Sequence, residues 1–90
     1  MASIDQTAAV LHGFIARAER DDFAAVQGAV LEHALAEPDP RARPAALDAL
    51  LDRLSDGIRP DTFSPLQQAF YVAVLAMIER TRDEVGRVAG

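Results

Sequence analysis

The chain contains no cysteine, lysine, asparagine or tryptophan among its 90 residues. The absence of cysteine excludes disulfides, thiolate metal sites, iron–sulfur clusters and cysteine nucleophiles. The absence of lysine excludes Schiff-base chemistry and a lysine general base. A cysteine-free chain fits a reducing compartment, and we therefore expect a cytoplasmic protein.

Long apolar runs and basic segments are also missing. No apolar run reaches the roughly 18 residues that a membrane-spanning helix needs, and residues 1–10 lack the basic and apolar regions of a secretion signal. We expect a chain that is neither secreted nor inserted in a membrane. The net charge is −5, from 14 acidic residues and nine arginines. This charge disfavours nucleic acid as a partner, because a phosphate backbone attracts cationic surfaces.

The residues that are present favour a folded helical protein. Half of them are apolar and 26% are charged, which is a globular balance. Ninety residues suffice for one core, so residues 1–90 are expected to form a single domain. We predict an all-α fold, a compact bundle of four helices with short loops. The expected helices cover residues 4–20, 22–36, 44–56 and 65–88.

Two capping boxes place the starts of the first and last helices. Ser3 with Gln6, and Ser64 with Gln67, have the spacing at which a serine side chain accepts from the helix and the glutamine reaches back to the serine amide. Pro65 occupies the first helical position of the second box, where its missing N–H costs nothing. This second box is the strongest boundary signal in the sequence.

Other residues predict the remaining boundaries. Asp21 and Asp22 are candidate N-caps for the second helix. Three prolines in residues 37–44 predict a connector, because each proline disfavours helix at the residue before it. Gly57 is the expected left-handed stop of the third helix, with Ile58 placed for the accompanying apolar contact.

Residues 70–78 read FYVAVLAMI, nine consecutive apolar residues inside the longest predicted helix. A helix that is apolar all round must be covered on every side. A monomeric bundle could enclose this run, but we expect the cover to be a second copy of the chain or another protein. Tyr71, Val72 and Leu75 point away from the main apolar face of the helix, and we predict that they lie in a protein interface.

The second predicted helix is apolar on two opposite faces. Val26 and Val30 belong to one face, and the other face is formed by small and aliphatic residues. Its members are Ala24, Gly28, Leu31 and Leu35. Because Ala24 and Gly28 let another helix approach closely, we predict that this second face also takes part in an interface.

No catalytic, metal or cofactor site is predicted. The two histidines, His12 and His33, are not part of any metal-binding motif, and the five glycines do not form a phosphate loop. Phosphotransfer domains place lysine and glycine three and four residues after their histidine, whereas Ala36 and Glu37 follow His33. We therefore expect no cofactor, and a histidine packed between helices.

These features favour a non-catalytic protein-binding module, a small acidic regulator of the inhibitor, antitoxin, immunity-protein or adaptor type. Its expected partners are itself, as a homodimer, and a protein with a basic surface that meets Asp48, Asp52 and Asp56. One alternative is a ligand-binding or catalytic bundle with a site between subunits that uses His33 or Arg82. Another is a structural or assembly subunit.

Overall fold

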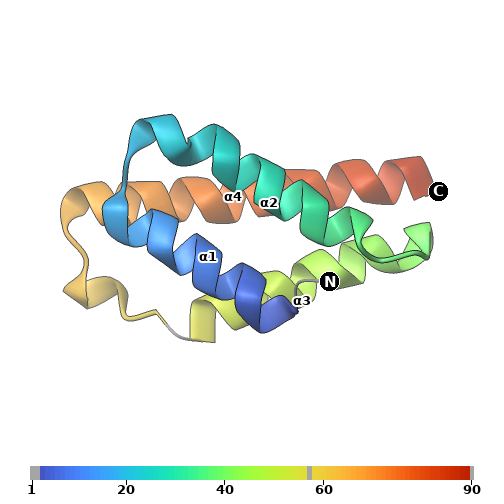
Figure 1. Cartoon of the computed structure of the whole chain (residues 1–90), viewed down its shortest axis with the longest axis horizontal. Coiled ribbons are helices and arrows are strands. Elements are labelled where there is room, and N and C mark those ends of the chain that lie inside the picture. The colour runs from blue at the N-terminus through green and yellow to red at the C-terminus, as the bar shows by residue number, and fades with distance from the viewer. Residues whose placement is uncertain (1–2, 57, 90) are drawn as a thin grey trace.

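The longest helix, α4 (Pro65–Ala89), runs the length of the molecule, with α1 (Ile4–Arg17) and α2 (Phe23–Leu35) crossing in front of it and α3 (Arg43–Asp56) packed along it (Figure 1). A helix of 25 residues is about 37 Å long, which accounts for the 39 Å long dimension of this computed structural model. The short dimensions are both 20 Å, as expected for a bundle about two helices thick.

The structure describes residues 3–56 and 58–89, and within them it contains four α-helices and no strand. The predicted all-α four-helix bundle is therefore confirmed. Each connector includes one short 3₁₀ turn that the sequence did not predict. These turns are η1 (Arg20–Asp22), η2 (Pro40–Ala42) and η3 (Pro60–Thr62).

Both predicted capping boxes are formed. Ser3 Oγ accepts from the Gln6 amide at 3.2 Å, and the Ser3 amide donates to Gln6 Oε1 at 3.0 Å. The same pair of bonds joins Ser64 and Gln67, at 3.2 and 2.9 Å. Gln67 Nε2 also donates to the carbonyl oxygen of Ala16 at 2.8 Å, and so fills one of the carbonyls left open at the end of α1. The start of α4 is thereby joined to the end of α1.

One predicted boundary was wrong, and one predicted cap is not formed. The first helix ends at Arg17 instead of residue 20, because Ala18 adopts the left-handed conformation (φ 49°) and its amide donates to the Phe14 carbonyl. Asp22 precedes α2 but makes no side-chain cap, since α2 continues directly from η1 with helical backbone angles. The other helix ends lie within one residue of the prediction. The expected stop at Gly57 falls outside the described residues.

The core is aliphatic and is drawn from all four helices. Phe70, Val74, Met77 and Ile78 of α4 are buried against side chains of the other three. The fully or almost fully buried contributors from those helices are Leu11, Ile15, Val26, Val30, Ala34, Leu47, Leu50 and Leu54. Burying a large aliphatic side chain stabilises a fold by roughly 1.5–3 kcal/mol. These side chains form the interior that joins the four helices.

Replacement of Leu50 tests this core. Leu50→Ala removes a side chain with no exposure, and we expect the free energy of unfolding to fall by about 2–5 kcal/mol because a cavity replaces the lost methyl groups. Urea denaturation followed by circular dichroism measures the change. Leu66→Ala is the matched control, because Leu66 is 67% exposed, and we expect a change below about 0.5 kcal/mol. Equal losses in the two variants would contradict the packing described.

Candidate protein-binding surface

The apolar run of α4 is covered mainly by the chain itself. Of residues 70–78, five are buried and two are partly buried, and only Val72 and Ala76 are exposed. The surrounding helices α1, α2 and α3 all contact α4, which explains how they enclose it. The expectation that this run needs a second molecule to cover it was therefore wrong for most of its length.

We had predicted that Tyr71 lies in a protein interface, but its side chain is buried within the chain. Its side chain is 9% exposed, because Phe63 from the preceding connector packs edge-on against its ring at 5.9 Å between centroids. Its hydroxyl donates to Ser55 Oγ of α3 at 3.4 Å. Leu75 is partly buried against the core. Only Val72, at 62% exposed, faces solvent as expected.

An apolar surface is left open on α2. Val26, Val30 and Ala34 fill the core, and the four residues predicted on the opposite side of the helix all face solvent. We call these residues, Ala24, Gly28, Leu31 and Leu35, the α2 outer face. Leu31 is 44% exposed and Leu35 is 53% exposed. Their spacing of four, three and four residues is that of the apolar seam of a coiled coil.

Gly28 has no packing role within the chain. A Cβ atom added at this position would meet nothing within 4 Å. A glycine inside a helix costs about 0.5–1 kcal/mol relative to alanine, and the rest of the bundle gives no reason for that cost. Its effect is to leave a notch in the α2 outer face between Ala24 and Leu31.

The α2 outer face borders two shallow grooves. One, of about 450 Å³, is lined by Gly28, Leu31 and Leu35 together with Glu32 and Ala36. Glu32 and Ala36 also line a second groove, of about 300 Å³, between α2 and α1. Val10 of α1 lies on its far side and is half exposed. The exposure of Val10 was not predicted from the sequence. It could have been, because Val10 lies about 100° around the helix axis from Leu11 and therefore outside the buried stripe of α1.

The two side chains proposed for a ligand site do not come together. His33 lines the groove between α1 and α2, where its Nδ1 lies 3.4 Å from Thr7 Oγ1. Arg82 lines a separate groove beside Pro44 and donates to Asp48 Oδ1 at 2.8 Å. The hydrogen bond from Arg82 to Asp48 raises the pKa of the guanidinium above its ordinary value. His33 is held between two helices, as predicted for a packed histidine.

The predicted acidic face on α3 is partly neutralised. Asp48, Asp52 and Asp56 are all exposed, but Asp48 pairs with Arg82. Arg53, which lies between the other two in sequence, pairs with Asp5 of α1 at 2.6 Å. The face therefore carries charges of both signs. Among the described residues, no ion pair involves Asp52 or Asp56. The face is a weaker attractor for a basic protein than three unpaired carboxylates would be.

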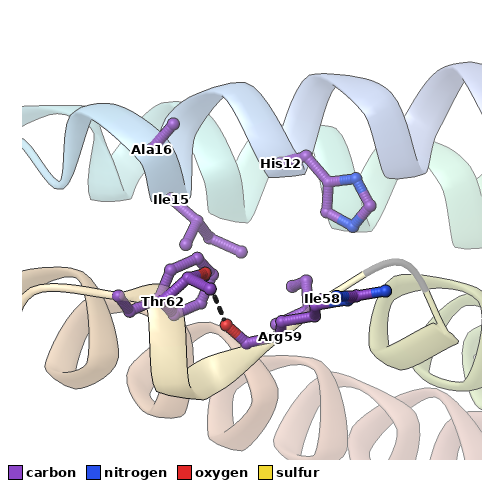
Figure 2. A pocket seen from close by; sticks show the side chains of 7 residues that line it. His12, Ile15, Ala16, Ile58, Arg59 and Thr62 are labelled. Atoms are coloured by element: carbon purple, nitrogen blue, oxygen red, sulfur yellow. Dashed lines mark hydrogen bonds between the residues drawn. The ribbon is translucent and has the colours of Figure 1, made fainter.

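A further groove, of about 360 Å³, lies between α1 and the segment around η3. Figure 2 shows His12 and Ile15 pointing from α1 towards Ile58 and Arg59, where Thr62 donates to the Arg59 carbonyl. His12 Nε2 lies 3.1 Å from the Leu54 carbonyl oxygen. A carbonyl only accepts, so Nε2 carries the proton and fills an open carbonyl at the end of α3. The role of His12 is therefore to cap this helix.

Chemistry-bearing clusters are not found in the described part of the chain. Residues 3–56 and 58–89 contain no group of three metal-binding side chains, and no helix in them is both long and apolar enough to cross a membrane. Every buried side-chain nitrogen and oxygen described there has a hydrogen-bond partner. The surface that calls for an explanation is the apolar one on α2.

Comparisons with protein-family models, curated proteins and solved structures found no match for the chain. The functional argument therefore depends on the surface itself.

Gly28→Ala tests whether the notch serves the fold. Because an added Cβ meets nothing within 4 Å, we expect the free energy of unfolding of the isolated chain to rise by about 0.5–1 kcal/mol through helix propensity alone. Thermal denaturation by circular dichroism at low concentration measures this. Gly13→Ala is the control, because Gly13 is equally open. A loss of stability for Gly28→Ala alone would show that the fold itself needs the notch.

His12→Ala tests the cap on α3. Removal of the Nε2 donor leaves the Leu54 carbonyl without this partner, and we expect the free energy of unfolding to fall by about 1 kcal/mol. His12→Gln restores an N–H donor at similar reach and should recover most of the loss. Urea denaturation of the three proteins gives the comparison. Similar stability for the wild type and His12→Ala would mean that the bond contributes nothing.

Proposed function

We propose that the chain is a non-catalytic protein-binding module that acts through helix–helix contact at the α2 outer face. The observation that carries this proposal is the exposure of Leu31 and Leu35 on a helix whose opposite side already fills the core. A stripe of leucines and small residues on a helix is the surface that another amphipathic helix recognises.

The contrast with the rest of the molecule supports this proposal. The other large apolar side chains that are exposed stand singly on α1 and α4, and single exposed residues need no explanation. On α2 two leucines follow each other at one-turn spacing beside a notch that the fold does not use. Such a continuous apolar surface is typical of a site that another protein covers.

Charge suits a regulator that meets its partner by diffusion. The net charge of −5 is carried on a chain of only 9.7 kDa, and exposed carboxylates such as Asp52 and Asp56 lie on the surface of α3. Such a field speeds encounter with a basic protein that meets the carboxylates of α3. This supports a regulator of the inhibitor, antitoxin, immunity-protein or adaptor type, with the apolar contact made by α2.

Capture experiments test the proposal. Tagged wild-type chain, Leu31→Asp and Leu66→Asp serve as baits for untagged chain and for an extract of the source cells. Leu31 and Leu66 are both exposed, so neither change should disturb the fold. We expect at least one protein, an untagged copy of the chain included, to be retained by the wild type and by Leu66→Asp and to be lost with Leu31→Asp, because the aspartate brings an unpaired charge into an apolar contact.

Circular dichroism of the three baits confirms that each is folded. Equal retention by all of them would show that the α2 outer face is not the binding surface. Failure of the wild type to retain any protein would contradict the proposed function as a whole.

A further inference from the structure

We infer that the occupant of the α2 outer face is the same face of a second copy of the chain, with the two α2 helices antiparallel. This inference rests on the proposed function, because it names the partner of the same surface. Its starting point is the order of side-chain sizes along the face. Reading from the N-terminus, two small residues, Ala24 and Gly28, precede two large ones, Leu31 and Leu35.

Two copies of this face fit together when one of them is reversed. When two copies run antiparallel about a two-fold axis between Gly28 and Leu31, Ala24 lies opposite Leu35 of the second copy and Gly28 lies opposite Leu31. Each leucine then faces a small residue, so the helices can approach evenly along the contact. A parallel pair would place leucine against leucine at one end and alanine against alanine at the other, and the helices would splay apart.

The acidic side chains beside the face are compatible with the same arrangement. Glu32 flanks the face. In the antiparallel register the two copies of Glu32 are separated by about 7.5 Å along the helix axes, and each lies beside Ala25 of the other copy.

The size of the face sets the strength of the contact. The α2 outer face has four residues, whereas a standard stable interface has about 20–30 residues a side and buries about 800 Å² per partner. The dimer should therefore be of the weaker class, forming at high concentration and separating on dilution.

Cysteine cross-linking tests both the contact and its direction. The chain has no cysteine of its own, so Ala24→Cys and Leu35→Cys each supply one thiol at an exposed position. Under mild oxidation we expect a mixture of the two variants to give several-fold more disulfide-linked dimer than either variant alone. Preferential cross-linking of each variant with itself would indicate a parallel pair and overturn the inference.

The control pair is Leu66→Cys with Val72→Cys, two exposed positions on α4, for which we expect only the low cross-linking of random collisions. Cross-linking of the control as strong as that of the α2 pair would also overturn the inference.

Sedimentation equilibrium separates this inference from the proposed function. We expect the mass of the wild-type chain to rise from monomer towards dimer with concentration, and Leu31→Asp to remain a monomer over the same range. A wild-type chain that stays monomeric overturns the homodimer. If such a monomer still retains another protein in a manner that depends on Leu31, the binding function stands with a different partner; if it retains none, both proposals are wrong.

Discussion

Burial of the apolar face of α4 is the interaction on which the rest of the structure depends. Val74 and Ile78 have no exposure, and Met77 has almost none, because α1, α2 and α3 all pack against this helix. Helix α4 is also the longest element, so it sets the length of the bundle and the positions at which the shorter helices find apolar partners. Once these helices are placed around α4, each can turn only one face inward.

For α2 this geometry has a functional consequence. The helix is apolar on both faces, and the bundle buries the side that carries Val26 and Val30, which leaves Leu31 and Leu35 in water. Exposed leucines add no stability to the isolated chain, and Gly28 lowers the helix propensity without filling a packing need. Both features acquire a physical reason when another helix packs on this surface, since the leucines then become buried and the glycine permits close approach.

Most features set by neighbouring residues could be predicted from the sequence, whereas features set by distant contacts could not. The starts of α1 and α4 were predictable because Ser3 and Ser64 bond to residues three positions away. The end of α1 was missed because Ala18 takes a left-handed conformation that alanine rarely adopts. Tyr71 was misplaced because Phe63, which covers its ring, reaches it only through the fold of the connector. The α2 outer face is exposed, as its predicted place in an interface requires.

The most direct test of the account is a concentration series of ¹⁵N–¹H correlation spectra of the wild-type chain, which reports on every backbone amide at once. The account predicts that the signals that shift as concentration rises belong to residues 24–36 and to their neighbours around Val10 of α1, and that the rest of the spectrum stays in place. Shifts centred on Val72 of α4 or on Asp52 and Asp56 of α3, with α2 unchanged, would contradict it.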